Sequence, residues 1–184
     1  VAEVTGARAR KVATTIGGGL VGWAAGGQAL VATGRMDANG QEGIWSIGLD
    51  GSEPQLIHQV YRPRDPLLSP GGEWLAFHVA LTGDPGQNGL WILRIDGSGL
   101  SKITPFGSYR WRADGRLLLI PLTLEQAPTL FEVDASAGRA VQLTDPAQTS
   151  LPIASGDWVV SPDGSQVAFT SWADRAVWVL TLPD

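Results

Sequence analysis

The sequence of 184 residues contains no cysteine, only two histidines and a single methionine. The absence of cysteine excludes disulfide bonds, thiol catalysis and cysteine-ligated zinc. Basic residues are also few, because 13 Lys and Arg stand against 18 Asp and Glu and leave a formal net charge of -5. Nucleic-acid binding, which depends on concentrated positive charge, is therefore not expected.

The sequence also lacks a long uninterrupted hydrophobic run. Residues 16–32 are apolar and follow three basic residues, in the manner of a leader or membrane anchor, but six glycines interrupt them. Each glycine costs about 1 kcal/mol in a helix, so membrane insertion is not expected. Gly17, Gly19 and Gly22 fit the G-x-G-x-x-G pattern of dinucleotide-binding proteins. That pattern requires a strand before the glycines and a helix after them, and neither is predicted here.

The abundant residues are glycine, proline and tryptophan, and they recur in a repeat. Four segments carry a similar turn sequence: Trp23–Gly27, Leu68–Gly72, Trp111–Gly115 and Val160–Gly164. A short apolar run follows each turn, and a further run carries an aromatic residue: Trp45, Trp91, Phe131 or Trp178. The turn sequences are rich in Gly and Asp, which favour tight turns, and the runs are rich in residues typical of strands.

This repeat predicts an all-β fold, a β-propeller of four-stranded antiparallel blades. A unit of about 40–50 residues has the size of one blade, and no segment of helical length has a sustained 3.6-residue period. The aromatic residue of the third run is expected to fill the space between neighbouring blades.

The predicted boundaries treat residues 1–184 as a single propeller domain or part of one, with about four to five blades. Full blades are expected at 20–58, 66–104 and 107–144, a three-stranded blade at 155–184, and two strands at 1–15. The latter follow from an ungapped alignment of residues 3–15 with residues 132–144. The strand at 11–15 is expected either to complete the last blade in a closed ring or to belong to a larger ring completed by other chain. Unpaired blade edges would then favour self-association.

Three segments resemble the TolB-type, WD-like propeller repeat. They are Ser161–Gly164 with Trp178, Leu68–Gly72 with Trp91 and Ile103–Thr104, and Trp111–Gly115 with Leu143–Thr144. The first full blade is the weakest match, because Ala25–Gly27 replaces Pro-Asp-Gly. The resemblance implies a fold, and for function only a general expectation: an interaction module in the periplasm or at the cell surface, or a propeller attached to a peptidase or kinase.

In a propeller, the start of each innermost strand lines the central channel. The residues expected at this mouth are Arg64, Asp65, Tyr109, Arg110 and Asp157. Such a mixture of charged and aromatic groups suits a small anionic or peptide ligand. The loops between second and third strands, at 34–43, 82–89, 121–129 and 171–176, are a second candidate surface and hold several acids and amides.

No catalytic or metal-binding pattern accompanies these residues. His58 and His78 lie in different predicted blades, so each is expected to be a lone strand residue. The sequence therefore predicts no metal, cofactor or catalytic residue. It favours a non-catalytic interaction module, outside the cytoplasm, that binds a protein or small ligand through its loops and axial mouth. The alternative is the propeller domain of an enzyme, of the peptidase-gating or the lyase or hydrolase type, with titratable groups converging at the mouth.

Overall fold

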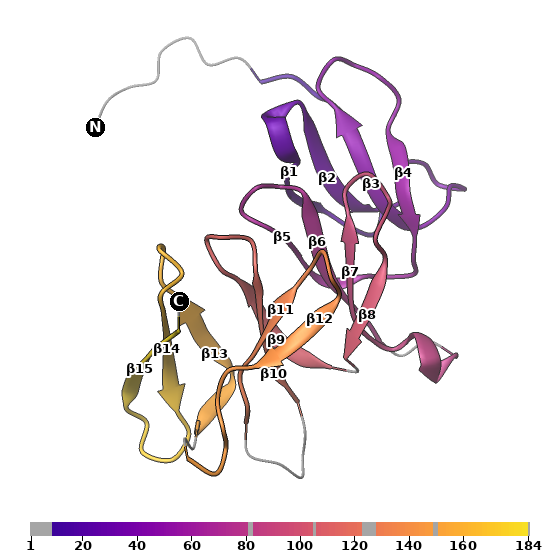
Figure 1. Ribbon diagram of the computed structural model, residues 1–184. Helices are drawn as coiled ribbons and strands as arrows, with labels where there is room; N and C mark the ends of the chain where they lie inside the picture. The colour runs from indigo at the N-terminus through magenta and orange to yellow at the C-terminus, as the bar shows by residue number, and fades with distance from the viewer. Residues whose placement is uncertain (1–8, 81–82, 105, 123–127, 149–150, 184) are drawn as a thin grey trace, which may run out of the picture.

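The computed structural model describes residues 9–80, 83–104, 106–122, 128–148 and 151–183, and their regular structure is almost entirely β (Figure 1). The first sheet contains β1 (Leu20–Trp23), β2 (Ala29–Gly34), β3 (Gly43–Gly48) and β4 (Gln55–Gln59). The second contains β5 (Arg64–Leu68), β6 (Trp74–Val79), β7 (Gly89–Arg94) and β8 (Ser101–Thr104). The third contains β9 (Gly107–Trp111), β10 (Leu117–Pro121), β11 (Phe131–Asp134) and β12 (Arg139–Gln142). The fourth contains β13 (Ile153–Val160), β14 (Gln166–Ser171) and β15 (Val177–Thr181), and two short 3-10 turns, Ala25–Gly27 and Pro85–Gln87, complete the inventory of the described residues.

Each sheet is an antiparallel meander in which the strands follow chain order, so the strand order within every sheet has no crossover. The innermost strands β1, β5, β9 and β13 contact one another in succession. Figure 1 shows the four sheets arranged as an arc, with β1–β4 at one end and β13–β15 at the other. This is the arrangement of propeller blades, and it confirms the predicted all-β fold of antiparallel blades.

The predicted turn motif has the same geometry in successive blades. Between β5 and β6 the Ser69 amide donates to the Trp74 carbonyl at 2.8 Å, and the Gly72 amide donates to the Ser69 carbonyl at 2.8 Å. Gly72 has a φ of +71°, which a residue with a side chain adopts only at a cost. A Cβ atom there would also lie 2.6 Å from the Ala25 amide nitrogen. Glycine thus allows the turns of neighbouring blades to touch.

Three hydrophobic clusters lie between the sheets and form the core. The cluster between the first and second blades includes Val31, Ile44, Leu75, Phe77, Val79 and Leu93. The cluster between the second and third includes Ala76, Leu90, Ile92, Tyr109, Leu117, Leu119, Val133 and Ala135. The cluster between the third and fourth includes Leu118, Ile120, Leu130, Leu151, Ile153, Trp158, Val167, Phe169 and Leu182. Each blade is therefore stabilised mainly by burying its apolar faces against its neighbours.

The aromatic residues of the third strands do not share one environment. Trp91 and Phe131 pack against the clusters on the second blade's two sides, as the sequence predicts. Trp45 lies on the outer face of the first blade, opposite Ala32 in the register of β2 and β3. Trp178 is opposite Phe169 and remains 51% exposed. The third-strand aromatic residue thus fills the space between blades in the second and third blades, and it does not do so in the first and fourth.

The prediction of two strands in residues 1–15 was wrong for the part that can be compared. The first of these strands falls within residues 1–8, which lie outside the described residues. Residues 11–15 form no strand. They lie instead across the outer face of the first blade, where they line a cavity of about 320 Å³ with Leu30, Ala32 and Ile47. The edge of β15, with which this segment was expected to pair in a closed ring, lies at the far end of the arc and out of reach (Figure 1).

Candidate functional site

The starts of the innermost strands of the second and third blades enclose a cavity of about 550 Å³. Three groups of residues line it: Asp65, Pro66 and Leu67 of β5, Gly107, Ser108, Tyr109 and Arg110 of β9, and His78, Phe106, Leu122 and Gly156 from their surroundings. The position at strand starts follows from the antiparallel meander, which brings the first residues of every innermost strand to the same side of the arc. The cavity lies at the starts of innermost strands, where the sequence leads us to expect an axial mouth.

Asp65 has an unusual backbone conformation at this mouth. Its φ is +50°, in the left-handed region that Asp tolerates better than most residues but adopts rarely. It falls where the pairing of β5 with β6 shifts, between Arg64 and Leu67. The Asp65 carbonyl accepts a hydrogen bond from the Tyr109 hydroxyl, which links the second blade to the third. Rare backbone conformations that tertiary contacts hold in place are frequent at functional sites.

His78 lies against the Asp65 carboxylate and is enclosed by aromatic rings. Its Nδ1 is 3.5 Å from the Asp65 Oδ2, and its side chain is 13% exposed while that of Asp65 is 78% exposed. The His78 ring meets the Tyr109 ring edge-on at a centroid distance of 4.9 Å and the Phe106 ring at 5.7 Å. The His78 Nε2 is buried without a hydrogen-bond partner in the described part of the chain. The Asp65 carboxylate is therefore exposed beside a histidine that is itself packed between two aromatic rings.

Tyr109 acts as a fixed hydrogen-bond donor at the base of the cavity. It is 2% exposed, and its hydroxyl also approaches the Ala76 carbonyl at 3.4 Å. Burial, and then the negative charge of Asp65, raise the pKa of Tyr109 far above its ordinary value. The phenol consequently stays protonated over the whole physiological range and holds β5 and β6 in place rather than transferring protons.

Arg110 supplies the positive charge of the mouth and spans two blades. Its Nη1 donates to the Tyr109 carbonyl at 2.7 Å and its Nη2 to the Gly156 carbonyl at 3.2 Å. The guanidinium carbon lies 5.3 Å from the centre of the Trp158 ring, and the Trp158 Nε1 donates to the Ser108 hydroxyl at 2.8 Å. No ion pair joins Arg110 to a carboxylate among the residues that the structure describes. Its charge is oriented by neutral groups and is not neutralised.

The structure brings together three of the five residues predicted at the mouth. Asp65, Tyr109 and Arg110 line the cavity, whereas Arg64 and Asp157 are exposed and do not line it. The pairing of β5 with β6 shifts between Arg64 and Leu67, and that of β13 with β14 shifts between Ile153 and Trp158, so the regular alternation of strand side chains does not decide which of these residues reach the cavity.

His78, which the sequence predicts to be a lone strand residue, also lines the cavity. It lies opposite Arg64 in the register of β5 and β6. This cross-strand pairing is visible only in the structure, and spacing along the sequence does not reveal it.

Three aspartates of the strand-connecting loops, Asp37, Asp84 and Asp174, accept hydrogen bonds within their own turns. Asp37 Oδ1 accepts from the Asn39 amide at 2.9 Å, and Asp174 Oδ1 accepts from the Ala176 amide at 3.0 Å. Within the described ranges, no three His, Asp or Glu side chains are close enough together to hold a metal ion. Nor does any described helix have the length and apolar character needed to cross a membrane. Residues 123–127 of the third loop lie outside the description.

Blades, arc and axial cavity together define the class of the protein: it is a β-propeller. No family model matches the chain. The chain is 27% identical over 166 residues to the uncharacterized protein Atu1656 of Agrobacterium fabrum, an alignment that covers 82% of this chain and 54% of that protein.

Two solved structures extend the comparison. Oligogalacturonate lyase in complex with manganese has a TM-score of 0.58 and 16% identity, over 84% of this chain and 40% of the lyase. TolB from Acinetobacter baumannii has a TM-score of 0.53 and 14% identity, over 90% of this chain and 43% of TolB. The fold is thus TolB-like, and the chain spans about half the length of the proteins that it matches.

Proposed function

We propose that the chain is a non-catalytic interaction module that binds a protein segment or a small ligand at the axial cavity. The observation that carries the proposal is the cavity itself, which has a volume of about 550 Å³ and is lined by the apolar Leu67, Phe106 and Leu122 and by the charged Asp65 and Arg110. A mostly apolar cavity with a few oriented polar groups is typical of ligand sites.

The charges favour an anionic group on the ligand. Arg110 has five N–H donors, and two of its nitrogens donate to backbone carbonyls. The remaining donors and the full positive charge are available to a carboxylate, with Trp158 supporting the flat face of the guanidinium. The Asp65 carboxylate, beside His78, supplies a second polar contact for a donor group on the same ligand.

A panel of small carboxylates and short peptides with free carboxyl termini, screened by thermal shift, tests the proposal. We expect at least one class to bind, and Arg110→Ala to weaken it about tenfold or more, as loss of a charge-assisted hydrogen bond predicts. The matched control is Arg64→Ala, because Arg64 precedes the mouth but does not line the cavity. Equal loss in both variants, or no binding to any member of the panel, would contradict the proposal.

An enzyme is the second candidate, favoured by the 3.5 Å approach of His78 to Asp65. Against it, Tyr109 is committed to carbonyl acceptors, and the His78 Nε2 is buried without a hydrogen-bond partner among the described residues. A turnover that is lost in both Asp65→Asn and His78→Gln, while ligand affinity persists, would favour the enzyme over the binding module.

We further propose that the module acts outside the cytoplasm, on the strength of its likeness to TolB-type repeats. Fractionation of cells that express the natural gene product, with detection by an antibody against this chain, tests the location. Recovery in the cytoplasmic fraction alone would overturn it.

A further inference from the structure

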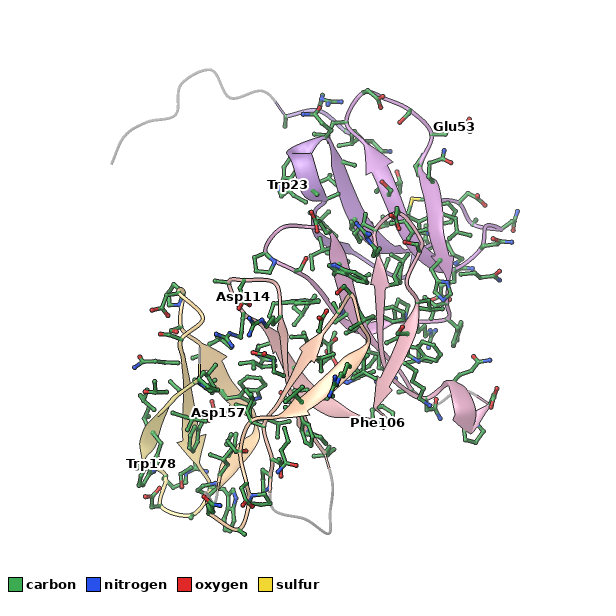
Figure 2. The ribbon with its side chains drawn as sticks, in the orientation of Figure 1. Trp23, Glu53, Phe106, Asp114, Asp157 and Trp178 are labelled. Atoms are coloured by element: carbon green, nitrogen blue, oxygen red, sulfur yellow. The ribbon has the colours of Figure 1, made fainter. Side chains whose placement is uncertain are left out.

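A second cavity, of about 470 Å³, lies between the first and second blades. Strand β4 and the connection that follows it form one side, and β6, β7 and the turns before and after β7 form the other. Figure 2 shows side chains of these two blades projecting toward one another. Both blades have all four strands, and the volume falls within the range of about 300–1,000 Å³ that is typical of small-molecule sites.

This inter-blade cavity is separate from the axial cavity, although β6 contributes to both. Successive side chains of a strand point to opposite faces, and β6 pairs with β7 without a shift of register. His78 therefore faces the axial cavity, whereas Phe77 and Val79 face the inter-blade cavity. None of the described residues lines both, so the two sites can be tested independently.

Aromatic rings provide the apolar part of the lining. Phe77 is 1% exposed, Trp91 is half-buried and Tyr61 is 61% exposed, so the rings extend from the core to the surface. The Trp91 Nε1 donates to the Gln87 carbonyl at 2.8 Å, which fixes the orientation of the indole ring. Such rings offer flat apolar surfaces on which a ring-shaped ligand can stack.

The polar part of the lining consists of His58, Gln59 and Gln87. Within the described ranges, their side chains form no hydrogen bond to another residue. Partial burial lowers the pKa of His58, so at pH 7 its ring is neutral and has one donor and one acceptor nitrogen. A side-chain amide likewise both donates and accepts. These groups therefore suit a partner that can do the same, as a hydroxyl does.

Charge is absent from the lining that the structure describes, since it contains no Asp, Glu, Lys or Arg. Arg62, next to the cavity in sequence, has its guanidinium carbon 5.2 Å from the centre of the Tyr61 ring. Lys102, opposite Trp91 in the register of β7 and β8, donates to the Gly86 carbonyl at 2.7 Å. A charged ligand would lose hydration here without meeting an opposite charge, and a wholly apolar ligand would leave the polar groups without partners.

We propose that the inter-blade cavity binds a neutral sugar, whose ring stacks on the aromatic side chains and whose hydroxyls bond to His58, Gln59 and Gln87. A pyranose ring has apolar C–H faces and a rim of hydroxyls that donate and accept hydrogen bonds. It thus matches both parts of the lining and needs no charge. The inference does not rest on the ligand proposed for the axial cavity, because the two cavities share no described residue.

Titration calorimetry of the full chain with neutral trisaccharides of glucose, galactose and N-acetylglucosamine tests the site. We expect at least one of them to bind at millimolar concentration or below. Trigalacturonate, whose rings carry carboxylates, is the acidic counterpart. Any binding of trigalacturonate should be unaffected by Gln59→Ala, because it would take place at another site.

Substitutions at exposed positions connect binding to this cavity without disturbing the fold. Gln59→Ala, Gln87→Ala and Tyr61→Ala should each weaken the neutral trisaccharide about fivefold, the scale of one neutral hydrogen bond or stacking contact. Their melting temperatures should match that of the unmodified chain, since all three side chains are exposed. Gln55→Ala is the matched control, because Gln55 is exposed on the same strand β4 but does not line the cavity.

Four results would each overturn the sugar site. The first is failure of every neutral trisaccharide to bind, and the second is an equal loss of affinity in Gln55→Ala. The third is binding of trigalacturonate that Gln59→Ala weakens as much as it weakens the neutral sugar. The fourth is tighter binding of an apolar ring such as indole that Tyr61→Ala weakens and Gln59→Ala does not.

Discussion

The two ends of the arc carry the same kind of sheet but bury it to different extents. At the first blade, residues 10–15 lie over the outer face, and Ala32 and Ile47 are 1% and 4% exposed. At the fourth blade nothing among the described residues covers Val159, Val177 and Val179. The comparison shows that burial in this fold is decided by the neighbour of a blade and not by the blade's own sequence.

The largest expected effect is a difference in stability between two substitutions at equivalent repeat positions, one in an interior blade and one in the last blade. Leu90→Ala should lower the free energy of unfolding by about 3 kcal/mol, because it leaves a cavity between two blades. Val177→Ala should cost less than about 1 kcal/mol in the monomeric chain, since the side chain is already exposed. Urea unfolding at low protein concentration measures both. Equal costs would show that the fourth blade is covered even in the single chain.

A smaller effect is expected when the covered end is uncovered. Removal of residues 1–15 should expose Ala32 and Ile47 and lower the free energy of unfolding by about 2 kcal/mol, the scale for one medium-sized apolar side chain. Binding of a hydrophobic dye should rise at the same time. Removal of residues 1–8 alone is the control and leaves the covering segment in place. If the longer deletion left stability and dye binding unchanged, the segment would not protect the face.

The smallest expected effect is a difference in acid sensitivity between the two ends. Hydrogen bonds from the Ser161 hydroxyl and from the Ser165 amide and hydroxyl lower the pKa of Asp163 to about 2 from 3.8. Because the folded-state pKa is depressed, this stabilisation is present above pH 3.8 and is lost as the pH falls through about 2. The corresponding residue of the first blade is Gly26, which has nothing to titrate.

The Asp163→Asn variant should therefore lose less stability than the unmodified protein between pH 4 and pH 2, and thermal melts over that range measure the difference. Asp50, Asp96 and Asp134, whose pKa values are also lowered by serine hydrogen bonds, keep their share of the acid response in both proteins. Identical pH profiles for the two proteins would contradict the role given to Asp163.

The fold was predictable because the turns that separate its strands are specified by local sequence. A turn such as Ser69–Gly72 depends on residue types with special backbone preferences, and these recur once in each blade. The placement of residues 10–15 was not predictable in this way. Their sequence specifies a strand, but strand formation requires a free edge nearby, and that depends on the arrangement of whole blades.

The candidate site was predictable only in part for a related reason. Asp65, Tyr109 and Arg110 could be inferred from their position at the starts of innermost strands. Which side of a strand each residue faces depends on the pairing register, and a shift at Arg64–Leu67 changes it. For the same reason His78, on a second strand, could not be connected to Asp65 from spacing alone.

The irregular pairing of the innermost strands has a consequence for how such a mouth diversifies. Ile153 and Trp158 of β13, five residues apart, face Ser171 and Phe169 of β14, two residues apart, so the chain between them bows out of the ladder. This bulged segment contains Gly156, whose carbonyl accepts a hydrogen bond from Arg110. Residues can be gained or lost in such a bow without moving the outer strands or the layers between blades. Insertions and deletions in these segments can therefore change the rim of the cavity during evolution while the blades keep their arrangement.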